Sequence, residues 1–249
     1  DVIIKCMQCI LDDTVGDVAK EKATEEWSGK LREARDCRSF TSLAVLVKKA
    51  SGGKLLLTIV KMIGERETRD AKQVERLLET ILVACVGGCY TQVDLLMVAH
   101  QLLSLDPSMS TPSSGSTATT IRSLFPLLGL KMISSVIKKD EGKSRDQLKS
   151  IINALIPTIT DQWLSGTQDQ CITAAIKLTC LLLVEYGGLP VLEDLTLLHK
   201  LLQSAFELIV RSSTAKQGEL IAAAFKYVAL MLRDRPEVPI TDPQLRALL

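Results

Sequence analysis

Two cysteines three residues apart, Cys6 and Cys9, form half of a zinc or redox motif. A structural zinc site needs four ligands that converge tetrahedrally, and no second cysteine pair with this spacing occurs in the chain. The two histidines, His100 and His199, are far away in the sequence. Because Cys6 and Cys9 also match one face of a helix, the spacing favours packing in a core. We therefore expect neither a metal site nor a cofactor.

Catalysis by a serine or cysteine nucleophile requires a base beside the nucleophile. Only His100 and His199 could be histidine bases, and each lies beside a leucine-rich segment without a motif that presents an activated serine. The segment Ser51–Lys54 (SGGK) contains a Gly-Lys pair. However, Lys48 and Leu55 stand where a phosphate-binding loop needs glycine and Ser or Thr. We predict that the chain is not an enzyme, since an enzyme would need a buried cleft around one of the histidines.

Two groups of basic residues could bind phosphate groups. The first comprises Lys48, Lys49 and Lys54. The second comprises Lys138, Lys139, Lys143, Arg145 and Lys149, and is tempered by Asp140, Glu141 and Asp146. The net charge of the chain is only +1 and aromatic residues make up 4%, whereas dedicated nucleic-acid binders usually carry a basic excess and stacking rings. We expect solvated helix ends, and keep nucleic-acid binding through these lysines as the alternative function.

The apolar residues, 47% of the chain, recur almost everywhere with the spacing of an amphipathic helix. Three stripes show it: Val74, Leu77, Leu78, Ile81, Leu82 and Cys85; Leu192, Leu195, Leu198, Leu202, Ala205, Phe206 and Ile209; and Ile221, Ala224, Phe225, Val228 and Leu232. No convincing alternating strand with a hairpin turn occurs. The sequence therefore predicts an all-α fold of about 10–12 helices.

Helix starts recur at regular intervals in the C-terminal half. Capping boxes predict starts at Ser144, Thr167, Thr214 and Thr241, and a Gly-Gly-Pro break predicts one near Leu192. The starts are about 22–27 residues apart, so two helices occupy about 47 residues, close to the period of HEAT and armadillo repeats.

Short motifs between residues 120 and 235 resemble the same repeats. The motifs with a HEAT-like pattern are Ala154–Pro157 (ALIP), Asp169 and Ala174–Leu178 (AAIKL). Those with an armadillo-like pattern are Gly187–Leu192 (GGLPVL) and, more weakly, Leu124–Leu128 (LFPLL). The arginine common in the second HEAT helix falls near Thr173 here, so the residues do not separate HEAT from armadillo. The resemblance implies an α-solenoid of stacked antiparallel helix pairs that acts as a binding scaffold.

We predict one continuous solenoid made of helical repeats in residues 1–105 and 121–249, joined by a Ser/Thr/Pro-rich loop at 106–120. Thr111 precedes Pro112 in this loop and is a candidate regulatory phosphosite. The chain begins without methionine in a helical pattern, which suggests a fragment of a longer protein. Seven irregularly spaced cysteines fit reduced thiols, and therefore an intracellular protein of the cytoplasm or nucleus.

We expect the helices at Thr167–Tyr186 and Thr214–Arg233 to line one face of the solenoid. The candidate partner-binding residues on this face are Lys177, Lys226, Tyr227 and Arg233. The predicted function is that of a non-enzymatic scaffold or adaptor. Its expected partner is a protein or peptide, such as another subunit of a complex, and neither a membrane nor a small-molecule substrate.

Overall fold

The computed structural model describes residues 2–16, 38–49, 52–64, 71–88, 90–104, 124–140, 145–211 and 217–246. Within these ranges the regular structure is helical throughout and contains no strand, which confirms the predicted all-α class. The chain divides into two compact units, Asp1–Met132 and Ile133–Leu249. The division falls inside a helix, whereas the boundaries predicted from the sequence lie at residues 105 and 121 and remain predictions. The candidate phosphosite Thr111 lies outside the described residues.

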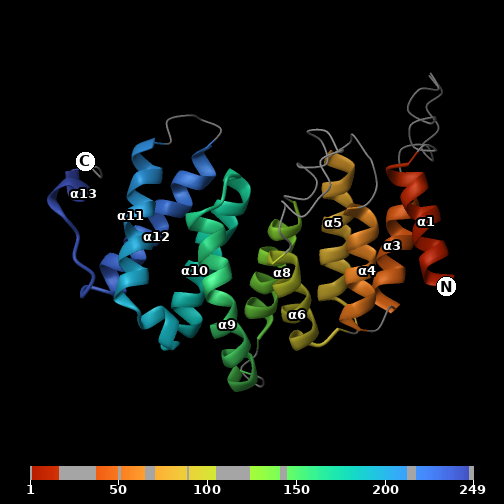
Figure 1. Cartoon of the computed structure of the whole chain (residues 1–249), viewed down its shortest axis with the longest axis horizontal. Helices are drawn as coiled ribbons and strands as arrows, with labels where there is room; N and C mark the ends of the chain where they lie inside the picture. Colours follow the sequence, from red (N-terminus) through yellow and green to blue (C-terminus); the bar gives the residue numbers. More distant parts are fainter. Residues whose placement is uncertain are drawn as a thin grey trace. The chain divides into compact units, whose positions relative to one another are not determined.

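The first unit is built from helices that stack on the next helix but one (Figure 1). Its helices are α1 (Val2–Thr14), α3 (Arg38–Lys49), α4 (Gly53–Gly64), α5 (Ala71–Val86), α6 (Gln92–Leu103) and the first part of α8 (Leu124–Lys139). α3 packs against α5, and α4 packs against α6. Alternate helices therefore form two layers, as in helical-repeat proteins.

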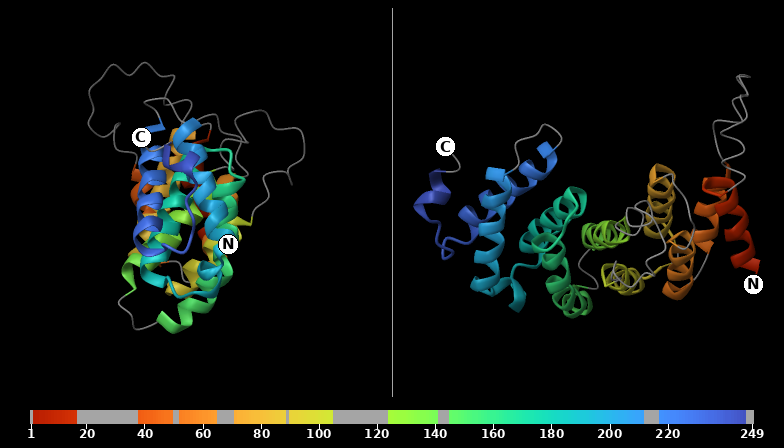
Figure 2. Two further views of the ribbon diagram at one scale, coloured as in Figure 1. Left: turned by 90° about the vertical axis from the view of Figure 1, so that its left-hand side faces the viewer. Right: turned by 45° about the horizontal axis from the view of Figure 1, so that its top comes forward.

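The second unit repeats this arrangement (Figure 2). It contains the rest of α8, then α9 (Arg145–Leu164), α10 (Asp169–Tyr186), the 3-10 helix η2 (Pro190–Glu193), α11 (Leu195–Arg211), α12 (Gly218–Asp234) and α13 (Asp242–Arg246). α10 packs against α12 and α9 contacts α11, while α10 also packs against α9 and α11 against α12. The two helices predicted to share a face, α10 and α12, therefore lie in one layer.

The predicted helix starts agree with the observed ones to within four residues. The corresponding elements begin at Arg145, Asp169, Leu195, Gly218 and Asp242. Part of one predicted capping box is present, because the backbone N–H of Thr241 donates to Gln244 Oε1 at 2.9 Å. The complete box in the described residues was not predicted: Thr91 and Asp94 cap α6 reciprocally.

Gly129 of α8 is a point of close approach to α6. A Cβ atom at this position would lie 3.0 Å from the carbonyl oxygen of Ala99 and 3.3 Å from Leu103 Cγ. Gly129→Leu should therefore lower the free energy of unfolding by about 2 kcal/mol, since overpacking outweighs the gain in helix propensity of about 1 kcal/mol. Urea unfolding measures the change. Gly218→Leu is the control, because no atom of the described residues lies within 4 Å of a Cβ at Gly218. Equal effects of the two substitutions would contradict the packing of α8 on α6.

Candidate partner-binding surfaces

The helix α12 packs against both α10 and α11, and this decides which of its side chains stay outside. Its buried residues are Leu220, Ala223, Ala224, Tyr227, Val228, Leu230 and Met231. Six of the residues left exposed follow one side of the helix at spacings of three and four: Ala222, Phe225, Lys226, Ala229, Leu232 and Arg233. We call these six residues the α12 outer face. Two large apolar side chains are about half exposed there, Phe225 at 43% and Leu232 at 49%.

The prediction that Tyr227 binds a partner is wrong, because its side chain is fully buried. Its ring meets the ring of Trp163 from α9 edge-on, with 4.7 Å between the centroids and 88° between the planes. Burial raises the pKa of Tyr227 above its ordinary value, and its hydroxyl has no hydrogen-bond partner among the described residues. The sequence stripe placed Phe225 inside and Tyr227 outside. Contact with α10 and α11 reverses this assignment, since it turns the buried arc of α12 toward Leu220, Ala223 and Tyr227 and leaves Phe225 and Leu232 outside it.

The three other residues predicted to bind a partner, Lys177, Lys226 and Arg233, lie on α10 and α12 and are exposed. Lys177 of α10 forms an ion pair with Glu219 of α12, with 2.5 Å between Nζ and Oε1. Arg233 donates two hydrogen bonds to Asp234, at 2.6 and 2.7 Å, and this interaction lowers the pKa of Asp234. Lys226 and Arg233 thus share the α12 outer face, while Lys177 links α10 to α12. Their role in binding stays a prediction.

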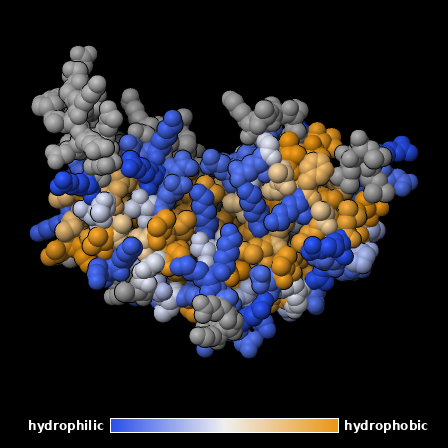
Figure 3. All heavy atoms as spheres, turned by 180° about the vertical axis from the view of Figure 1, so that it is seen from behind, coloured by the Kyte–Doolittle hydropathy of each residue, from blue (hydrophilic) through white to orange (hydrophobic). Residues whose placement is uncertain are grey.

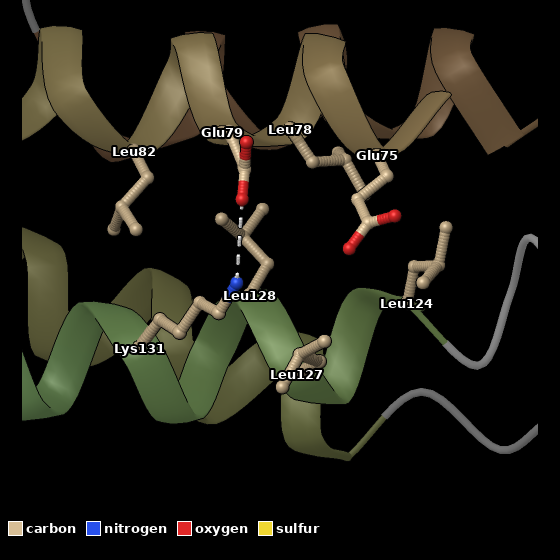
Figure 4. Close-up of a pocket in the computed structure, with 8 residues that line it drawn as sticks. All are labelled: Glu75, Leu78, Glu79, Leu82, Leu124, Leu127, Leu128 and Lys131. Atoms are coloured by element: carbon tan, nitrogen blue, oxygen red, sulfur yellow. Dashed lines mark ion pairs between the residues drawn. The ribbon is translucent and has the colours of Figure 1, made fainter. Parts of the chain in front are cut away.

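A leucine-lined groove between α5 and α8 was not predicted (Figure 4). Its walls are formed by Leu78, Leu82, Leu124, Leu127 and Leu128, with Glu75, Glu79 and Lys131 at its edges. Lys131 Nζ lies 3.7 Å from Glu79 Oε1, so an ion pair joins the two helices beside the leucines. The cavity holds about 20 Å³, which is room for one water molecule or methyl group and too little for a small-molecule ligand.

A larger cavity of about 240 Å³ lies among α4, α6 and α8. Its lining residues are Leu57, Val60, Lys61, Gln101, Leu102, Ser104 and Phe125. Most of this lining is apolar, so the cavity could accept an apolar side chain. Neither cavity could be predicted from single helices, because each forms only where helices from distant parts of the sequence meet. On the face drawn in Figure 3, hydrophobic residues likewise reach the surface between hydrophilic ones.

The two lysine-rich groups differ in how far their charges are neutralised. In the second group, Arg145 Nη2 lies 3.6 Å from the Glu185 carboxylate, and Lys149 Nζ lies 3.0 Å from the Asp146 carboxylate. Arg145 also lies over the ring of Tyr186, 5.1 Å from its centroid. Lys143 is outside the described residues. In the first group, the side chains of Lys48, Lys49 and Lys54 are exposed and form no ion pair within the described ranges.

The cysteines fall into two sets in the described part of the chain. Cys6 and Cys9 are exposed on α1, so the prediction that they pack in a core is wrong. Cys85, Cys171 and Cys180 are buried. Burial raises the pKa of Cys85 to about 12 and that of Cys180 to about 11.

We expect an alkylating reagent at about pH 8 to modify Cys6 and Cys9 in the native protein and to spare Cys85 and Cys180. The reacting species is the thiolate, and a pKa of about 12 leaves about one thiolate in 10⁴ at that pH even before access is considered. Peptide mass spectrometry after timed alkylation measures both sets. The same reagent in denaturant should modify all of them; fast native labelling of Cys85 would contradict its burial.

No group of three or more His, Cys, Asp or Glu side chains in the described ranges is placed to hold a metal ion. His100 is exposed and His199 is half-buried. None of the helices described has both the length and the apolar character needed to cross a membrane.

Comparison with known families gives one match. Residues 1–103 match a family model described as the U3 small nucleolar RNA-associated protein 20 domain. This range is less than half of the 249 residues and lies within the first unit. No curated protein matches the chain. The description of this family names a nucleolar RNA, which agrees with the predicted intracellular location. It runs against the expectation that nucleic acid is an unlikely partner.

Proposed function

We propose that this chain is a scaffold segment of a nucleolar complex that contains U3 small nucleolar RNA and acts in ribosome biogenesis. The family match over residues 1–103 carries this proposal. The two-layer helix packing of each unit supports it, because such packing presents long surfaces to partners. The motifs in residues 120–235 further support a divergent HEAT/armadillo-type repeat. The scaffold acts without catalysis.

The α12 outer face is the surface proposed to bind a protein partner. Phe225 and Leu232 give it apolar area that is costly to leave in water, and aromatic residues are enriched in the centres of protein interfaces. Lys226 and Arg233 lie beside them and favour acidic groups. The partner that fits is therefore a segment with apolar anchors flanked by Asp or Glu.

The test is to recover the tagged chain from nuclear extract and to quantify small nucleolar RNAs in the eluate. We expect U3 to be enriched at least tenfold over a small nucleolar RNA of a different class. Ribonuclease treatment before elution then separates the partners: proteins that remain bound are direct or protein-mediated partners. Equal recovery of both RNAs at background level would reject the proposal.

A further inference from the structure

We propose that the last residues of α3, the first residues of α4 and the pair Gly87–Gly88 after α5 form a basic edge of the first unit that binds the phosphate backbone of RNA. The residues that bind are Lys48, Lys49 and Lys54. The choice of RNA over other polyanions rests on the proposed function. The existence of an anion-binding edge rests on the geometry and charge of these described residues.

The end of α3 lies beside the end of α5, and the start of α4 lies beside the start of α6, because α3 packs on α5 and α4 packs on α6. A Cβ atom at Gly88, just after α5, would lie 3.4 Å from Lys48 Cα, and one at Gly87 would lie 4.0 Å from Lys48 Cε. The Lys48 side chain therefore runs along a glycine pair that has no side chains of its own. Gly52 and Gly87 are both exposed. The edge is thus a surface of backbone and lysine that a nucleic-acid strand can approach closely.

The positive charge of this edge is not neutralised by nearby carboxylates of the described residues. Asp94 near the start of α6 keeps its negative charge, but its carboxylate accepts hydrogen bonds from the backbone N–H and the hydroxyl of Thr91, at 3.3 and 2.7 Å, and forms no ion pair with these lysines. None of the three lysines forms an ion pair there. By contrast, Arg145 and Lys149 of the second basic group each have an acidic neighbour. The structure thus sharpens a difference that the acidic neighbours of the second group already indicate in the sequence.

The helix dipoles account for the positions of Lys48 and Lys49 but not for that of Lys54. Lys48 and Lys49 end α3, where the carbonyl end of the helix favours cations. Lys54 is the second residue of α4 and therefore lies at the N-terminal end of the helix, where the helix dipole disfavours a cation. The first turn of α4 contains no acidic residue that would compensate this charge. A phosphate group bound at this basic edge would stabilise all three positive charges.

The experiment is fluorescence anisotropy of a labelled single-stranded RNA of about 20 nucleotides titrated with the full chain at several salt concentrations. Three phosphate contacts predict that the binding constant falls about 15- to 20-fold between about 50 and 200 mM salt. The triple substitution Lys48→Glu, Lys49→Glu, Lys54→Glu should weaken binding at low salt at least tenfold and flatten the salt dependence. The matched control reverses Lys138, Lys139 and Lys149, the same change in net charge, and should weaken binding less than twofold.

Each outcome decides the proposal. Circular dichroism and urea unfolding establish first that both triple variants fold, and if the first does not, the single substitution Lys54→Gln replaces it, with an expected loss of about threefold. Equal losses in both variants would mean that net charge and not this edge attracts RNA. Equally tight binding of an acidic peptide of the same charge would overturn RNA as the ligand. Absence of RNA binding by the unmodified chain would overturn the edge while leaving its recovery with U3 through proteins untouched.

Discussion

Trp163→Ala should lower the free energy of unfolding by about 3–5 kcal/mol, the largest effect expected of any single substitution in the second unit. Trp163 is 2% exposed and is among the largest buried side chains. Its ring comes from α9 and meets Tyr227 of α12 edge-on, so its removal empties a site that connects the two layers of the unit. Urea unfolding monitored by circular dichroism measures the loss.

The neighbouring hydroxyl allows a sharper test of the same core. The Tyr227 hydroxyl is buried without a hydrogen-bond partner, so Tyr227→Phe should leave stability unchanged or raise it by about 1 kcal/mol. Tyr186→Phe is the matched control, because the Tyr186 hydroxyl donates to Asp140 Oδ2 at 2.7 Å. This control should lose about 1 kcal/mol. If Tyr227→Phe is the more damaging of the two, the Tyr227 hydroxyl must have a partner and its assigned environment is wrong.

The fold class and the helix starts from α9 onward could be predicted from the sequence because they depend on local physics. Apolar spacing sets the buried stripe of a helix, and Gly, Pro and capping residues set its ends. The stripe of α5 illustrates this: Val74, Leu77 and Ile81 are all buried. The HEAT-like motif was less informative, since Pro157 lies well inside α9 and not early in it.

The partner-binding surface could not be predicted in full, because it depends on how many neighbours each helix has. A stripe predicts one buried face, and it fails where contacts with two helices turn the buried arc away from that stripe. Tyr227 and Phe225 exchanged places for this reason. Cys6 and Cys9 show the opposite error: they lie on an apolar stripe of α1, but no helix of the described residues covers them.

The α12 outer face should be necessary for binding the protein partner that remains after ribonuclease treatment. The double substitution Phe225→Ser, Leu232→Ser removes the two half-exposed apolar side chains, and Lys226→Glu, Arg233→Glu reverses its charge. Each should raise the dissociation constant at least tenfold, which is about 1.4 kcal/mol and within the range of interface anchors. Biolayer interferometry with the purified partner measures the change.

The matched control is Lys200→Glu, Arg211→Glu on α11, which makes the same change of charge at two exposed positions of the neighbouring helix. The dissociation constant of this control for the partner should stay within twofold of the dissociation constant of the unmodified chain. The Glu variant should keep the unfolding midpoint, because Lys226 and Arg233 are exposed. The Ser variant should lower it slightly, because about half of Phe225 and of Leu232 is buried. Loss of binding in the Glu variant alone would mean that long-range charge attracts the partner without contact at Phe225 and Leu232. Loss in both, with the control intact, would place the partner on these residues, because only contact requires apolar and charged neighbours at the same site.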